Sequence, residues 1–182
     1  MRRSLRALGC TIAVLAAWGC PEEEGPACTE LGCAGGFDLW MTSTNDSDVF
    51  EEGRYDIWVD VAGGELFVQC FIDASGGGEC NPPSWREQPT EDIVATVVFG
   101  MPTTQQVINT PAIQLHFAGQ SEAPAGTNVF GPTPIAVEVD RDTRKVGQET
   151  YTPQYDRNTE FNGPEECGYC DSLERELLRL TP

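Results

Sequence analysis

The side chains of this chain that could carry out chemistry are a single histidine, His116, eight cysteines and 29 acidic residues. A Ser-His-Asp or Cys-His relay would have to pass through His116. That residue lies on the polar side of an alternating segment, however, and the sequence contains no Gly-x-Ser-x-Gly motif. One histidine also excludes the usual ligand sets of zinc hydrolases. We therefore predict that His116 is a surface residue and that the chain has no catalytic residue.

The acidic residues are numerous enough for paired-carboxylate chemistry of the glycosidase kind. The runs that stand out are Glu22–Glu24, Glu51–Glu52 and Glu165–Glu166, and they lie in tether or turn contexts where carboxylates are solvated. No sequence motif identifies two of these residues as a catalytic carboxylate pair. We predict a protein that is not an enzyme, and the alternative is an envelope enzyme that acts on carbohydrate or peptidoglycan through paired carboxylates.

Two clusters of oxygen ligands could hold calcium, which prefers hard oxygens on flexible turns. They are Asn45–Asp48, with Asp46 and Asp48, and the turn at residues 140–142. Neither matches the twelve-residue EF-hand loop, and Asx-rich turns commonly form because these side chains bond their own backbone. We predict no metal and no cofactor, with a calcium-dependent adhesion domain as a further alternative.

Three tryptophans are candidates for ligand binding. Trp40 and Trp58 alternate with the apolar residues of their segments and so fall on the opposite face, and Trp85 lies in a long loop after Cys80. An exposed indole beside acids can stack against a sugar or a protein partner, whereas loops that cover the sheet would bury the same ring. These tryptophans are therefore candidate contacts for a protein or carbohydrate partner, and burial beneath loops is the alternative.

The first twenty residues have the layout of a secretory signal peptide. Three arginines lie within the first six residues, and residues 7–18 are almost entirely apolar. A helix of that length spans roughly 18 Å, which is too short for about 30 Å of hydrocarbon. We predict that residues 1–19 are removed, which makes Cys20 the new N-terminus.

The small residue before Cys20 resembles the lipobox of bacterial lipoproteins, in which the cysteine is acylated. Ala17 and Trp18 stand where that pattern prefers Leu and then Ala or Ser, and Ala17 with Gly19 also suits an ordinary signal peptidase. Both interpretations place the cleavage site before Cys20, and they differ only in whether Cys20 carries lipid. We predict lipidation of Cys20, because an unpaired exported thiol is otherwise hard to explain. The protein would then be exported and anchored to a membrane of the cell envelope.

Six cysteines remain once Cys10 and Cys20 are set aside: Cys28, Cys33, Cys70, Cys80, Cys167 and Cys170. An even set in an exported chain predicts three disulfides. A local Cys70–Cys80 bridge around a glycine-rich loop is the simplest pairing, and it leaves the two early cysteines to meet the two late ones. The alternatives are a four-thiolate zinc site made by those four, a redox pair at the Cys-Gly-Tyr-Cys motif, and other connectivities.

Charge limits the partners further. The net charge is −18, and removal of residues 1–19 leaves 8 basic against 29 acidic residues, a net charge of −21. Such a chain is repelled by nucleic acid and by anionic lipid, so we predict no nucleic-acid partner. Residues 20–34 then form the lipid-anchored cysteine and an acidic tether, and residues 35–182 suffice for one core.

From residue 37 onward the hydrophobic period is two, which predicts strands. Tyr55–Val61 and Leu66–Ile72 alternate on either side of Ala62-Gly63-Gly64, a loop able to close a hairpin. Further strands are predicted at 93–99, 113–117, 135–139 and 145–151, with dense Gly and Pro between them. This pattern predicts an all-β, antiparallel, immunoglobulin-like β-sandwich of about seven to eight strands, stapled by disulfides. The C-terminal leucines allow a helix or a closing strand near 176–180, and we favour the strand.

Several of these features occur together in a known group of proteins. Cys28-Thr-Glu-Leu-Gly-Cys33, Glu52-Gly-Arg-Tyr-Asp56, the cysteine in the next strand, and Asn162-Gly-Pro-Glu-Glu-Cys-Gly-Tyr-Cys170 together resemble the small cysteine-containing lipoproteins common in myxobacteria. The second glutamate before Cys167 is a small departure from that pattern. The resemblance covers most of the mature chain and implies an envelope lipoprotein with an immunoglobulin-like domain and no assigned activity. We accordingly expect a non-catalytic structural or binding module.

Overall fold

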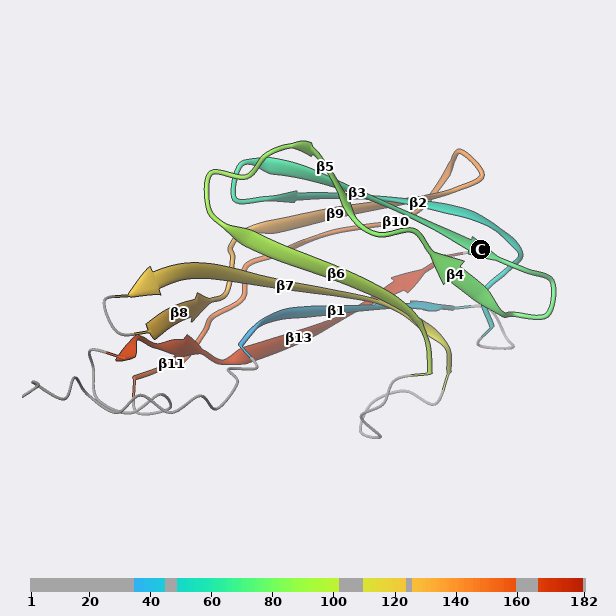
Figure 1. The fold of residues 1–182 in the computed structure, drawn as a ribbon. Coiled ribbons are helices and arrows are strands. Elements are labelled where there is room, and N and C mark those ends of the chain that lie inside the picture. The colour runs from blue at the N-terminus through green and yellow to red at the C-terminus, as the bar shows by residue number, and fades with distance from the viewer. Residues whose placement is uncertain (1–34, 45–48, 102–109, 124–125, 160–166, 182) are drawn as a thin grey trace, which may run out of the picture.

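The computed structural model describes residues 35–44, 49–101, 110–123, 126–159 and 167–181, which form thirteen strands and, within these ranges, no α-helix. Eight strands have seven or more residues: β1 (Gly36–Ser43), β2 (Gly53–Val61), β3 (Gly64–Ile72), β6 (Ile93–Gly100), β7 (Ala112–Ala123), β9 (Ile135–Arg141), β10 (Arg144–Tyr151) and β13 (Leu173–Leu180). Five are shorter: β4 (Gly78–Cys80), β5 (Ser84–Glu87), β8 (Gly126–Phe130), β11 (Arg157–Asn158) and β12 (Cys170–Asp171). The strands form two layers (Figure 1), which confirms the predicted β-sandwich.

Sheet A is built around the long strand β7. This strand pairs antiparallel with β1 and β6 on its two sides over residues 113–117, and with β8 over residues 119–123. The first and last long strands, β1 and β13, pair in parallel, and β12 pairs in parallel with β8. The sandwich is therefore mostly antiparallel, with its C-terminal strand laid beside its N-terminal one (Figure 1).

Sheet B has the strand order β10-β9-β2-β3-β4, and β5 also pairs with β3. The β2–β3 hairpin closes through Ala62 and Gly63, whose φ angles are 49° and 73°. Positive φ at both turn residues is typical of the type I′ turn that matches the twist of a hairpin. Asp142 and Thr143 join β9 to β10 with φ angles of the same sign. Both predicted turns are thus confirmed.

The core lies between the inner faces of the two sheets, as the alternation predicted. Sheet A contributes inward residues of β1 and β7, and sheet B contributes those of β2, β3 and β9. The fully buried large side chains are Phe37, Leu39, Met41, Ile57, Val59, Val61, Leu66, Val68, Ile113, Leu115, Phe117 and Ile135. Because the inner residues fill the core, any binding chemistry has to come from the outer faces or the edges.

The C-terminal segment is a strand, as favoured above. Leu178 and Leu180 of β13 are buried, and the strand runs in register beside β1 from Gly36 to Ser43. Its end also joins the two sheets, because the Thr181 backbone N–H donates to the Val146 carbonyl of β10 at 2.8 Å.

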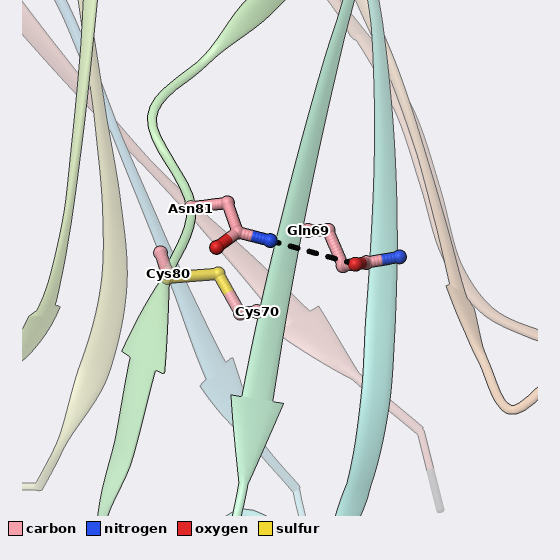
Figure 2. Close-up of a disulfide and its surroundings, with 4 residues drawn as sticks. All are labelled: Gln69, Cys70, Cys80 and Asn81. Carbon is pink, nitrogen blue, oxygen red and sulfur yellow. Dashed lines mark hydrogen bonds between the residues drawn. A yellow bond between two sulfur atoms is a disulfide. The ribbon is translucent and has the colours of Figure 1, made fainter.

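The predicted local disulfide joins Cys70 of β3 to Cys80 of β4, with Cα atoms 4.0 Å apart (Figure 2). The two residues face each other across the strand pair, and Cys70 is fully buried. Next to the bridge, the Asn81 backbone N–H donates to the Gln69 carbonyl at 2.8 Å. Cys167 and Cys170 are also disulfide-bonded; their predicted partners, Cys28 and Cys33, lie outside the described residues, as do Cys20 and the rest of 1–34.

Replacement of both Cys70 and Cys80 by alanine is expected to lower the free energy of unfolding by roughly 2–3 kcal/mol, the loop-closure entropy of so short a loop. Urea denaturation of the otherwise oxidised protein measures the loss. Glu79→Gln on the same strand is the control and should change stability by less than about 0.5 kcal/mol. A double variant as stable as the control would show that the bridge does not stabilise the hairpin.

Candidate binding surface

The structure places the three candidate tryptophans in three different environments. Trp58 is half-buried on the outer face of sheet B. Trp40 also points outward, from sheet A, but it is only 3% exposed. Trp85 is partly buried and packs against the core. Asp46 and Asp48 lie outside the described residues. Of the three described candidate tryptophans, Trp58 is the one that is half-buried on an outer face.

Two of these predictions are corrected by contacts that a single sequence does not display. The guanidinium of Arg175 lies 4.3 Å from the centre of the Trp40 ring, and Leu177 of β13 is in register beside it. The segment after Cys80, predicted as a long loop, contains strand β5, which sets Trp85 opposite the core residue Leu66. The Trp40 indole is therefore buried, and Trp85 is packed against the core and not on an outer face.

Trp58 belongs to an aromatic pair on the outer face of sheet B. It stands directly opposite Phe67 of β3, and the two ring centres are 4.5 Å apart with a 43° tilt. The guanidinium carbon of Arg86 lies 4.9 Å from the Phe67 ring centre and 5.5 Å from that of Trp58. Both distances are within the range of a cation–π interaction. The face therefore carries two rings and one cation seated on them.

Carboxylates surround this pair. On the other side of Trp58, strand β9 places Glu138 in register with it. One step along the sheet, Asp60 of β2 faces Glu65 of β3, which in turn faces Glu87 of β5. A hollow of about 300 Å³ opens here, lined by Trp58, Asp60, Glu65, Ala136, Val137, Glu138 and Gln148. We call Trp58, Asp60, Glu65, Phe67, Arg86, Glu138 and Gln148 the Trp58 surface.

The acids of this surface differ in whether a cationic side chain pairs with them. Lys145, the only lysine of the chain, donates to Glu138 at 2.6 Å and to Gln148 at 3.1 Å. Asp60 and Glu65 form no ion pair with any residue that the structure describes. The Trp58 surface thus retains uncompensated negative charge beside its aromatic rings.

Most of this surface was not predicted from the sequence. Phe67 could have been found, because it alternates with the buried residues of the 66–72 segment and therefore falls on the outer face. Arg86, Glu138 and Gln148 come from β5, β9 and β10, and their approach to Trp58 depends on strand order. A single sequence carries no direct signal for that order.

His116 occupies the outer face of sheet A, where it was predicted, and it is half-buried. Its Nδ1 lies 2.8 Å from Asp38 Oδ1, and the other oxygen of Asp38 accepts from Arg175 at 3.4 Å. Thr96 is in register with His116, but no hydrogen bond joins its hydroxyl to the described part of the chain. The contacts among His116, Asp38 and Arg175 link the three strands β7, β1 and β13. Among the described residues they lack the nucleophile contact of a catalytic relay.

A larger hollow, of about 540 Å³, lies where the edges of β10 and β13 approach each other. Its lining includes Lys145, Gln148 and Glu149 from β10 and Leu177 and Arg179 from β13. These described lining residues include no aromatic ring and no cluster of like charges. Its size alone does not indicate a ligand, and we place the candidate site at the smaller, chemically marked Trp58 surface.

Within the described residues, no three or more His, Cys, Asp or Glu side chains are placed to hold a metal ion. Over the same part of the chain, no helix is long and apolar enough to cross a membrane. Comparison with known proteins found no matching family model, no matching curated protein and no matching solved structure.

Proposed function

We propose that this protein is an exported, lipid-anchored component of the cell envelope and acts there as a non-catalytic binding module. The leader-like residues 1–19, Cys20 and the resemblance to cysteine-containing lipoproteins support the location. The observation that carries the binding role is the Trp58–Phe67 pair, held on the outer face of sheet B beside uncompensated acids.

Aromatic rings on an outer sheet face are suited to recognition. Trp, Tyr and Arg dominate the energetics of protein interfaces, and aromatic side chains such as Trp bury a large area with only two rotatable bonds. The Trp58 surface offers two such rings, an arginine and several hydrogen-bond acceptors. Because the rings come from neighbouring strands of the rigid β2–β3 hairpin, they are positioned before a partner arrives.

The anchor is tested by the intact mass of the protein purified from its native membrane fraction. The expected mass exceeds that of residues 20–182 by the acyl groups, and reduction adds two hydrogens for each of three disulfides. A bare mature mass in the soluble fraction would remove the lipoprotein assignment and leave Cys20 as a thiol that needs a partner.

The binding role is tested by co-sedimentation of the mature protein with washed envelope fragments from the cells that produce it. We expect Trp58→Ala to reduce the retained fraction at least fivefold. Val98→Ala is the matched control, because Val98 is an exposed apolar residue on the outer face of sheet A, 59% accessible, and it should leave retention unchanged. Equal retention of the two variants would contradict binding through the Trp58 surface.

A second candidate is the envelope enzyme with paired carboxylates. It is favoured by one observation, the three carboxylates of Asp60, Glu65 and Glu138 around the hollow beside Trp58. The same incubation distinguishes it, because hydrolysis of glycan would release reducing ends at a rate that Asp60→Asn or Glu138→Gln abolishes. The binding module predicts no such release.

The calcium-dependent adhesion domain has less support, since Asp46 and Asp48 lie outside the described residues. It predicts a higher melting temperature in millimolar calcium, because a ligand that binds the folded state stabilises it. A melting temperature that calcium does not change would remove this alternative.

A further inference from the structure

Like charges face one another across the strands beside Trp58. Asp60 is directly opposite Glu65, and Glu65 is directly opposite Glu87, so three acids cross β2, β3 and β5 in one row. Like charges directly opposite on neighbouring strands destabilise a sheet. Glu65 and Glu87 also belong to a strand pair with a register shift. The free protein therefore carries an electrostatic cost at this row, which a bound cation would relieve.

The neighbouring pair of aromatic rings also favours a bound cation. The faces of indole and phenyl rings attract cations through their quadrupole, and the Arg86 guanidinium already lies over both rings. The chain thus demonstrates with its own side chain that a guanidinium fits this surface. Asp60 and Glu65 are left without a described cation of their own, so the surface can take more positive charge than Arg86 and Lys145 provide.

The spacing favours a polymer with several cations over a single ion. The acids at Glu87, Glu65 and Asp60, with Glu138 beyond Trp58, occupy four neighbouring strands. Strands lie about 4.8 Å apart, so this distance is about 14 Å, the length of four to five extended residues. A compact metal ion is disfavoured, because no three acidic donors converge within the described residues.

We propose, on the basis of the binding role proposed above, that the Trp58 surface binds a basic, extended polypeptide segment. Its lysine or arginine side chains would pair with Asp60 and Glu65 and stack on the Trp58 and Phe67 rings. The net charge of the chain, −18, would speed the approach of such a partner over longer distances.

The test is calorimetric titration of the mature, disulfide-intact protein with an acetylated and amidated nine-residue peptide of alternating lysine and serine, at about 150 mM salt. At this ionic strength charges beyond about 8 Å are screened, so the effects of substitutions are local. We expect saturable binding that weakens as salt rises. Asp60→Asn with Glu65→Gln should weaken it at least tenfold, and Trp58→Leu about fivefold, with recovery in Trp58→Phe.

The matched control removes two charges elsewhere. Glu91→Gln with Asp92→Asn neutralises two exposed acids before β6 and should change affinity less than twofold. Melting curves of all variants confirm that each is folded. No binding of the lysine peptide, equal weakening in the control, equal binding of a glutamine–serine peptide, or equally tight binding of spermine would each overturn the proposal.

The outcomes separate this inference from the proposed function. If the lysine peptide does not bind while retention on envelope fragments still depends on Trp58, the ligand class is wrong and the binding module stands. If Trp58→Ala leaves retention unchanged, the binding surface itself is wrong, and with it the ligand class.

Discussion

The protein is expected to unfold as the pH rises from about 10 to 12. The measurement is too short for alkaline cleavage of the backbone. The cause is three tyrosines whose phenols are held neutral by the fold. Burial raises the pKa of Tyr55 to about 12, with a smaller effect from Asp142. Burial also raises the pKa of Tyr151 and of Tyr155, each with a smaller contribution from nearby acids.

The direction of the change in stability follows from the pH at which the folded and the unfolded chain lose their phenol protons. In the unfolded chain a tyrosine ionises near pH 10, whereas in the folded protein these three remain protonated to a higher pH. Their contribution to stability is therefore complete below pH 10 and is lost as the pH rises through the folded-state values. For Tyr55, which is 3% exposed, a rise of the pKa from 10 to about 12 corresponds to roughly 3 kcal/mol. That is a large part of the 5–15 kcal/mol typical of a domain.

Rapid-mixing experiments that follow tyrosinate absorbance and circular dichroism together measure this transition. We expect ionisation of Tyr55, Tyr151 and Tyr155 to coincide with loss of the β signal. Tyr55→Phe keeps the ring and removes the phenol, whose hydroxyl donates to the Glu51 carbonyl at 2.9 Å, and it should make stability fall less steeply above pH 10. Full tyrosinate absorbance in protein that is still folded at pH 11 would contradict the explanation.

Gly36→Ala is expected to lower the free energy of unfolding by more than about 3 kcal/mol. Gly36 begins β1 with a φ of +117°, a region that costs other residues about 1–3 kcal/mol. A Cβ at this position would lie 2.3 Å from the backbone oxygen of Phe117. That oxygen belongs to β7 in the middle of sheet A and cannot rotate away, so β1 itself would have to shift.

Gly100→Ala separates the two causes. Gly100 also has a positive φ, +153°, but a Cβ there meets nothing within 4 Å, so we expect a loss of about 1–3 kcal/mol from conformation alone. Urea denaturation with comparison of the slopes measures both variants. If Gly36→Ala cannot be recovered in folded form while Gly100→Ala folds, the destabilisation of Gly36→Ala is even larger than expected. Equal stability of the two variants would show that the contact with Phe117 is absent.

The alternation of the sequence was sufficient for the fold class because it reports burial directly. Residues 55–61 and 66–72 alternate without interruption, and an intervening turn able to take positive φ left one reasonable pairing. Cys70 falls on the inner set, which made a bridge to the nearby Cys80 geometrically simple. The C-terminal strand was harder, since Leu173, Leu177 and Leu180 fit a helical spacing as well.

The candidate site was only partly predictable, because it depends on which strands are neighbours. Alternation correctly placed both Trp40 and Trp58 on outer faces, but it could not show that Arg175 would cover one and not the other. Trp85 was misplaced because β5 is a four-residue strand without an alternating pattern of its own. The acids around Trp58 are separated by up to 78 positions, from Asp60 to Glu138, and only the pairing of β2 with β9 brings them together.

Hydroxyl-radical footprinting of the protein bound to envelope fragments reports which side chains the partner covers. If the partner binds at the Trp58 surface, oxidation of Trp58 and Phe67 falls on binding. Met101, which is 57% exposed at the end of β6, should remain fully reactive and serves as the internal control. Protection of Met101 and Val98 with undiminished oxidation of Trp58 would place the partner on sheet A and contradict binding at the Trp58 surface.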